Sequence, residues 1–200
     1  MTKILHLDSS AKGETSVTRK LTAEAVAKLK TQSDVTVVYR DLTANPLPHI
    51  SPEYLGGIFG NADFASHETV LLSDKLIGEL MDAETIVIGA PMYNFSIPSQ
   101  LKAWVDFVLR AGKTFKYIDG APVGLVTGKR AIIAVGSGGV YSQGPMAEYD
   151  HVAPFMRQVL GFIGITDVTV VRAEKQALGP DAAAEGFKEG EAELERAIAA

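Results

Sequence analysis

The stretch TIVIGAPMYNFSIPSQLK, residues 85–102, contains an apolar strand, a loop and the start of a helix. Residues 85–90 are mostly apolar and show no alternation with polar residues, which is typical of a strand covered on both faces. Pro98 suits the first turn of a helix, and apolar residues then recur with helical spacing up to Val108. The stretch therefore predicts one strand, loop and helix unit of a parallel sheet.

The same unit recurs along the chain. The five expected strands are the apolar runs at residues 4–7, 35–39, 85–90, 131–135 and 168–171, and a segment with helical spacing follows each of them. Five alternations predict an α/β fold with a doubly wound five-stranded parallel sheet and helices on both faces. Ligands of such folds bind outside the carboxyl ends of the strands, so we expect sites in the loops that begin at Asp8, Pro91 and Gly136.

Composition limits the function further. With 200 residues, of which 46% are hydrophobic, we expect a single domain over residues 1–200. The formal net charge of -5 argues against nucleic acid as a partner. No apolar run is long enough for a membrane span or a signal-peptide core, so we expect no membrane association and a cytoplasmic location. There are no cysteines and the histidines lack ligand spacing, so we expect no metal site, and any redox activity needs a bound cofactor.

The connection over residues 41–66 is long for a compact domain. It contains Pro and Gly residues with Tyr54, Phe59 and Phe64 between them, and it shows no sustained period. Loops of this length are usually functional or disordered, and the apolar content argues against disorder. We therefore expect an ordered segment that covers a pocket or a subunit interface.

The first loop, residues 8–18, is rich in Ser and Thr where the first strand meets the first helix. A helix N-terminus offers free N–H groups, and the hydroxyls of Ser10, Ser16 and Thr18 can donate further hydrogen bonds to a phosphate monoester. The alternative is that Ser16 only caps the helix. The Gly-x-Gly-x-x-Gly and Gly-Lys-Ser/Thr motifs are missing here, which argues against a Rossmann dinucleotide site and a nucleoside triphosphatase.

The second loop predicts a site for a flat apolar ring. Met92 and Phe95 can wall the ring, while Tyr93 and Asn94 bring polar groups to its edge. Backbone N–H groups in such a turn can meet the ring nitrogens and oxygens of a flavin. The alternative is an aromatic loop that only packs on the core.

The third loop, residues 136–145, begins with Gly136, Ser137, Gly138 and Gly139. Glycines let the backbone approach a ligand closely, so this loop can line the pyrimidine side of the same ring. Glycine loops are common, and the value of this one lies in its place after the fourth strand.

The sequence resembles the FMN-dependent NADH:azoreductases, also described as NADH:quinone reductases, within the flavodoxin-like NAD(P)H oxidoreductases. The block from Met92 to Phe95 is the most specific part of a resemblance that runs over nearly the whole chain. The other matching segments are residues 40–46, 110–115, 124–129 and 161–167. The resemblance implies a flavodoxin-like sheet in the order 2-1-3-4-5 and a homodimer that completes each active site.

The resemblance also implies non-covalent FMN and two-electron transfer from NADH or NADPH to quinones and to aromatic azo compounds, which are reductively cleaved. The implied FMN-binding residues are Ser10, Ser16, Val17, Thr18, Met92, Tyr93, Asn94, Phe95, Gly136, Ser137, Gly138 and Gly139. Two positions depart from the family pattern: Thr18 stands where Ser is common, and Gly136-Ser137 stands where some members have Ser-Arg. The missing arginine leaves the nicotinamide preference and the substrate range open.

We expect a ping-pong mechanism in which no side chain acts as a nucleophile, because the flavin does the bond chemistry. The candidates for stacking against substrate are Phe59, Phe95, Tyr117 and Tyr141. One alternative is a flavodoxin-style carrier that passes single electrons to a protein partner. Another is a flavin-free interaction module of the response-regulator type, which needs an acidic cluster after the first strand. Asp8 followed by serines does not supply that cluster.

Overall fold

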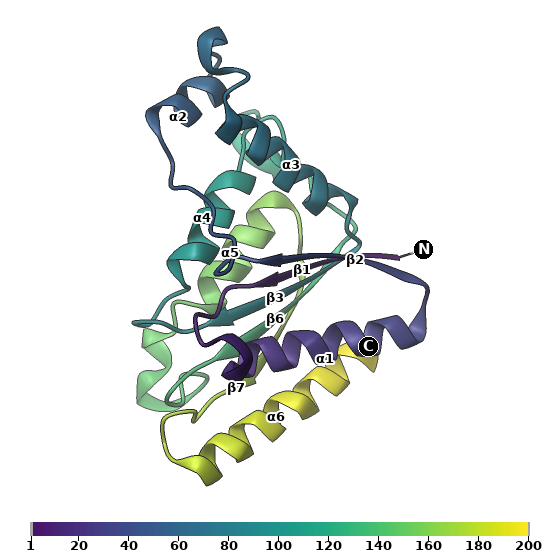
Figure 1. The fold of residues 1–200 in the computed structure, drawn as a ribbon, viewed down its shortest axis with the longest axis vertical. Helices are drawn as coiled ribbons and strands as arrows, with labels where there is room; N and C mark the ends of the chain where they lie inside the picture. The colour runs from purple at the N-terminus through teal and green to yellow at the C-terminus, as the bar shows by residue number, and fades with distance from the viewer. Residues whose placement is uncertain (1, 200) are drawn as a thin grey trace.

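A computed structural model describes residues 2–199, which form a five-stranded parallel sheet with helices on both faces (Figure 1). In spatial order the strands are β2 (Val35–Asp41), β1 (Thr2–Asp8), β3 (Thr85–Pro91), β6 (Arg130–Gly136) and β7 (Asp167–Ala173). All four neighbouring pairs are parallel. The predicted fold class and the order 2-1-3-4-5 of the main strands are therefore confirmed.

Two layers of helices cover the sheet (Figure 1). One layer contains α1 (Val17–Gln32) and α6 (Pro180–Ala199), and the other contains α3 (Glu68–Asp82), α4 (Ser99–Val108) and α5 (Ala153–Ile163). Successive strand residues point to opposite faces, so Ile4 of β1 packs in the core under α1, while Leu5 packs in the core under the second layer. The central strand β3 is buried along its whole length, which explains its lack of polar alternation.

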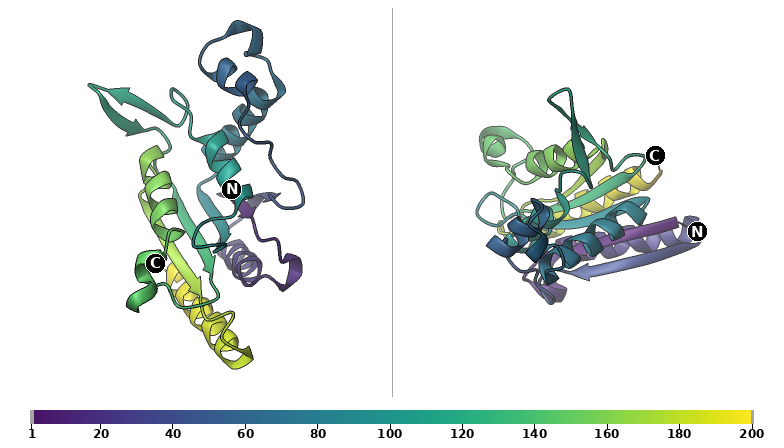
Figure 2. Two further views of the ribbon diagram at one scale, coloured as in Figure 1. Left: turned by 90° about the vertical axis from the view of Figure 1, so that its left-hand side faces the viewer. Right: turned by 90° about the horizontal axis from the view of Figure 1, so that it is seen from above.

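Two elements lie outside the alternating pattern. The long connection contains a short helix, α2 (Pro52–Ile58), which Ser51 caps by accepting a hydrogen bond from the N–H of Tyr54. A hairpin of β4 (Phe115–Ile118) and β5 (Ala121–Gly124) follows α4. Both α2 and the hairpin project beyond the sheet at the top of the left view in Figure 2. Among the described helices, none combines the length and the apolar character that a membrane span requires.

Two glycines of α6 allow this helix to pack closely on the end of β7. A Cβ atom on Gly186 would lie 2.0 Å from the carbonyl oxygen of Glu174, and one on Gly190 would lie 2.8 Å from that of Arg172. Neither distance is possible for real atoms without a shift of the helix. The glycines therefore set the spacing between α6 and the segment that follows β7.

We predict that Gly186→Ala lowers the free energy of unfolding by about 2 kcal/mol, because the added methyl group pushes α6 away from β7. The matched control is Gly78→Ala in α3, where a Cβ atom would meet nothing within 4 Å. That change should raise the free energy of unfolding by about 0.5–1 kcal/mol, because alanine favours helix. Urea denaturation measures both, and equal effects of the two substitutions would contradict the close packing.

Candidate functional site

The carboxyl ends of β1, β3 and β6 bring the three predicted loops together. Asp8 pairs with Gly89, and Pro91 pairs with Gly136, so the three strands end next to one another. A cavity of about 500 Å³ lies at this edge of the sheet. The predicted residues that line it are Ser10, Ser16, Val17, Thr18, Met92, Tyr93, Gly136, Ser137 and Gly138. Most of the predicted cofactor residues thus share one cavity.

The three predicted hydroxyl groups of the first loop line this cavity. Ser10, Ser16 and Thr18 are buried, and the hydroxyls of Ser16 and Thr18 lie 3.0 Å apart. The hydroxyl of Ser16 also accepts a hydrogen bond from the N–H of Arg19 at 3.3 Å, so it caps α1 while it lines the cavity. The capping role and the predicted ligand role therefore fall on the same side chain.

The second loop forms a tight turn beside the cavity. Tyr93 and Ser96 exchange two backbone hydrogen bonds of 2.9 and 3.2 Å, and the residues between them, Asn94 and Phe95, have φ angles of 49° and 72°. Positive φ angles are rare for residues other than glycine, above all for a bulky residue such as Phe95, and they often mark functional sites. The hydroxyl of Tyr93 accepts a hydrogen bond from the N–H of Ala11 at 3.0 Å, which links the second loop to the first.

The third loop lies against the first turn of α1. A Cβ atom on Gly136 would lie 2.9 Å from methyl groups of both Val17 and Thr18, so only glycine fits at this position without a shift. The N–H of Met92 donates to the carbonyl oxygen of Gly136 at 2.8 Å. The hydroxyl of Ser137 donates to the carbonyl oxygen of Gly139 at 2.8 Å. Gly139 itself does not line the cavity; its carbonyl helps to fix the shape of the loop.

Sequence reasoning missed the segment that follows β7. Gln176 and Ala177 line the cavity, and their N–H groups donate to the carbonyl oxygens of Ser137 and Gly138 at 3.0 and 2.9 Å. Before them, the buried carboxylate of Glu174 accepts hydrogen bonds from the N–H groups of Tyr141 and Ser142 at 2.7 and 2.9 Å. The available signal was positional, because β7 ends next to β6 at the same edge. Lys12, Thr15 and Pro91 also line the cavity.

The four predicted stacking residues fall into two groups. Phe95 lies beside Tyr141 and Tyr149, with ring centroids 6.2 and 5.6 Å apart, so these three residues form an aromatic cluster at the turn after β3, although none of them lines the cavity. Phe59, directly after α2, is 81% exposed, and Tyr117 on the hairpin is 63% exposed. Phe59 and Tyr117 do not line the cavity either, and no residue of the long connection does so. We expected this connection to cover either a pocket or a subunit interface. Within one chain it does not cover the cavity, so the first of these two roles is wrong for this cavity.

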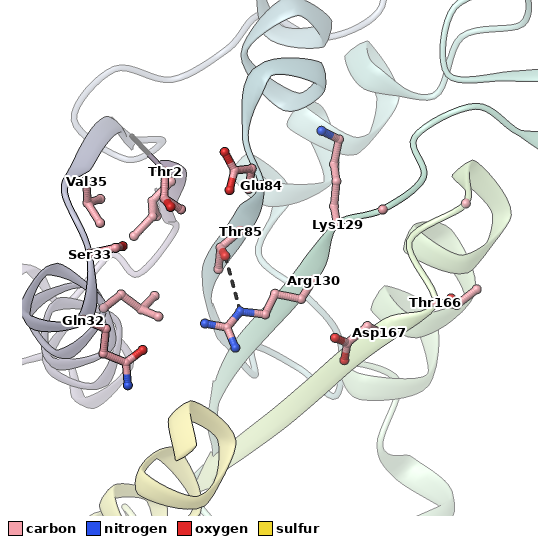
Figure 3. A pocket seen from close by; sticks show the side chains of 14 residues that line it. Thr2, Gln32, Ser33, Val35, Glu84, Thr85, Lys129, Arg130, Thr166 and Asp167 are labelled. Carbon is pink, nitrogen blue, oxygen red and sulfur yellow. Dashed lines mark hydrogen bonds between the residues drawn. The ribbon is translucent and has the colours of Figure 1, made fainter. Parts of the chain in front are cut away.

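A second cavity, of about 580 Å³, lies at the opposite edge of the sheet (Figure 3). Its lining includes Thr2, Thr85 and Arg130 at the amino ends of three strands. Helices α1, α3 and α5 end close to it, so the negative ends of their dipoles face this region. Burial lowers the pKa of Lys129 there, and its ammonium group donates to the carbonyls of Met81 and Ala83. The partial negative charge at these helix ends repels an anion from the second cavity. The partial positive charge at the start of α1 attracts an anion to the first cavity.

A network of charged groups lies behind the first loop. The buried carboxylate of Asp8 accepts hydrogen bonds from the hydroxyls of Thr22 and Tyr39 at 2.9 and 3.1 Å. Arg19 forms a two-pronged ion pair with Asp41, at 2.7 and 2.8 Å. Hydrogen bonds from Arg19 hold the pKa of Asp41 at about 2, and the N–H groups after Asp41 contribute to the same effect. Within residues 2–199, no group of three or more acidic or histidine side chains has the arrangement of a metal site.

A family model described as a flavodoxin-like fold matches residues 2–198 of the chain. The FMN-dependent NADH:quinone oxidoreductase 1 of Idiomarina loihiensis is 51% identical over 193 residues, which cover 96% of this chain and 98% of that protein. The FMN-dependent NADH:quinone oxidoreductase of Herminiimonas arsenicoxydans is 52% identical over 185 residues, or 90% of this chain and 91% of that one. The crystal structure of an azoreductase from Bacillus anthracis matches the whole of both chains with a TM-score of 0.90 and 32% identity.

The lowered pKa of Asp41 predicts how stability depends on pH. A carboxylate with a pKa of about 2 in the folded protein and an ordinary value of 3.8 stabilises the fold above pH 4, and this contribution is lost as the pH falls from about 4 to 2. Asp41→Asn should therefore lose less free energy of unfolding than the wild type over this interval. Urea denaturation between pH 5 and 2 measures the difference, with the exposed Asp34→Asn as a control for net charge. Parallel curves for the wild type and Asp41→Asn would contradict the ion pair.

Proposed function

Because this chain belongs to the flavodoxin-like family and is similar over most of its length to FMN-dependent NADH:quinone oxidoreductases, we propose that it is an FMN-dependent enzyme that transfers two electrons from NADH to quinones. We further propose aromatic azo compounds as acceptors, which would be reductively cleaved, as the likeness to an azoreductase suggests. NADPH is the alternative donor. The observation that supports this function best is the cavity, whose lining combines the hydroxyl groups of the first loop with the apolar side chains of Val17, Pro91 and Met92.

The residues of the cavity fit FMN. The hydroxyls of Ser10, Ser16 and Thr18 and the start of α1 would hold the phosphate, and they carry no negative charge that would repel it. Met92 and the glycine backbone at Gly136 would lie against the ring. The cavity is lined by one charged side chain, that of Lys12, whose positive sign suits a phosphate.

The turn after β3 can supply hydrogen bonds to the polar edge of the ring. The two bonds that close the turn use the N–H groups of Tyr93 and Ser96, and those of Asn94 and Phe95 make no hydrogen bond within the described residues. Donors fixed before the ligand binds stabilise negative charge at no further cost in reorganisation. We therefore assign to Asn94 and Phe95 the role of backbone donors to the ring.

Bound FMN would take a hydride from the nicotinamide and pass two electrons to the acceptor. The cluster of Phe95, Tyr141 and Tyr149 includes a residue of the turn that follows the cavity residues Met92 and Tyr93, and it offers aromatic surface on which a flat nicotinamide or quinone can stack. Since donor and acceptor would use the same surface in turn, we propose a ping-pong order. The chain's own residues then bind and orient the reactants, and none of them forms a covalent bond to substrate.

We propose that Phe59 and Tyr117 act in a homodimer. They lie on the projecting α2 region and hairpin, where further large apolar side chains are exposed, namely Ile50, Leu55, Ile118 and Val123. Exposed apolar surface of this kind is typical of an interface between protein chains. A second copy would bring these aromatic residues to a cavity that they do not reach in their own chain.

Light scattering is expected to give twice the 21.3 kDa mass of one chain.

We predict that the purified protein is yellow and that its flavin absorption bleaches when NADH is added without oxygen. Addition of a quinone should restore the absorption, and an azo dye in place of the quinone tests the second class of acceptor. Stopped-flow mixing should show reduction of the flavin by NADH before any acceptor is present, as a ping-pong order requires. A protein that takes up no flavin, or whose flavin stays oxidised with NADH, would rule the proposal out in favour of an interaction module or an electron carrier.

A further inference from the structure

Arg19 lies in the first turn of α1, behind the first loop, and is absent from the lining of the cavity. All five N–H donors of its guanidinium group are used. Two of them donate to the carbonyl oxygen of Ser10, at 2.9 and 3.3 Å, and two donate to the carboxylate of Asp41. The fifth donates to the hydroxyl of Tyr39 at 3.2 Å. Arg19 therefore has no donor left for a ligand, and any effect on binding must act through these partners.

Asp41 fixes the guanidinium group in this position. The ion pair is two-pronged and largely buried, with the side chains of Arg19 and Asp41 14% and 20% exposed. One oxygen of Asp41 also accepts hydrogen bonds from the N–H groups of Thr43 and Ala44, at 3.0 and 3.1 Å. The low pKa of Asp41 keeps the pair ionised at neutral pH. Planar two-pronged pairs of this kind fix orientation as well as distance.

The contact with Ser10 sets the direction of the next N–H group. The carbonyl of Ser10 and the N–H of Ala11 belong to one planar trans peptide group, so they point in opposite directions. Arg19 holds the carbonyl on the side away from the cavity. The N–H of Ala11 consequently points toward the hydroxyl of Tyr93, a residue that lines the cavity, at 3.0 Å.

We propose that Arg19, clamped by Asp41, is a positioning residue for the phosphate site of the cavity: it holds the peptide group between Ser10 and Ala11, so that the N–H of Ala11 stays bonded to Tyr93 and the hydroxyl of Ser10 stays at the cavity. This inference rests on the proposed binding of FMN. It assigns to Arg19 no contact with the phosphate, and it makes the geometry of the guanidinium group, rather than its charge, the property that matters. Lysine keeps the charge but is a point donor without the planar fork.

The test compares FMN with riboflavin, which has the same ring and lacks the phosphate. Arg19→Lys should raise the dissociation constant of FMN about 10- to 100-fold, the range for a lost hydrogen bond to a charged group. The dissociation constant of riboflavin should stay within a factor of about 3, a change smaller than 1 kcal/mol. Quenching of flavin fluorescence by the apoprotein measures both constants, and Asp41→Asn, which removes the clamp without touching Ser10, should show the same selective loss.

Arg40→Lys is the matched control. Arg40 also lies on β2, next to Asp41 in sequence, and forms an ion pair of similar burial with Glu79 of α3. Because neither Arg40 nor Glu79 lines the cavity, both dissociation constants should remain unchanged.

Two results would overturn the inference while the proposed function stands. In one, Arg19→Lys and Asp41→Asn bind FMN as tightly as the wild type. In the other, they lose FMN and riboflavin by the same factor, which would indicate general damage to the fold. A wild-type protein that binds neither flavin would instead refute the proposed function, and the inference with it.

Discussion

The parallel pairing of β1, β3 and β6 is the constraint on which the rest of this structure depends. In a parallel sheet all carboxyl ends lie at one edge, and the register of these three strands starts their loops side by side. The helices on both faces leave this edge as the place where loops from distant parts of the sequence can meet. The cavity is therefore a consequence of the strand order, and its chemistry is a consequence of which residues follow each strand.

Close backbone packing makes that edge rigid enough to hold a ligand in one geometry. A Cβ atom on Gly89 would lie 2.7 Å from the carboxylate of Asp8, and Gly136 fits against the first turn of α1 with no room for a side chain. The buried Asp8 is tolerated because the hydroxyls of Thr22 and Tyr39 donate to it. Hydrogen bonds between the loops, such as that from Ala11 to Tyr93, then join the parts of the site into one unit.

The sequence predicted the features that depend on local pattern. Unbroken apolar runs located the strands, and the rule for carboxyl ends located the cavity. The hairpin was missed although Asp119-Gly120 is a hairpin signal, and both residues have positive φ, of 51° and 81°. The helix α2 was missed although Ser51-Pro52 is a typical helix start. The pair of Arg19 and Asp41 had no local signal, because it depends on the pairing of β1 with β2 and on the position of α1 above them.

A crystal structure of the protein grown with FMN tests the central claim most directly. The account predicts that the phosphate lies within hydrogen-bond distance of the hydroxyls of Ser16 and Thr18, with the ring against the turn from Met92 to Phe95. It also predicts that the peptide group between Ser10 and Ala11 keeps its orientation. Phosphate bound instead in the cavity beside Arg130, at the amino ends of the strands, would contradict the claim that the three strand-end loops form the cofactor site.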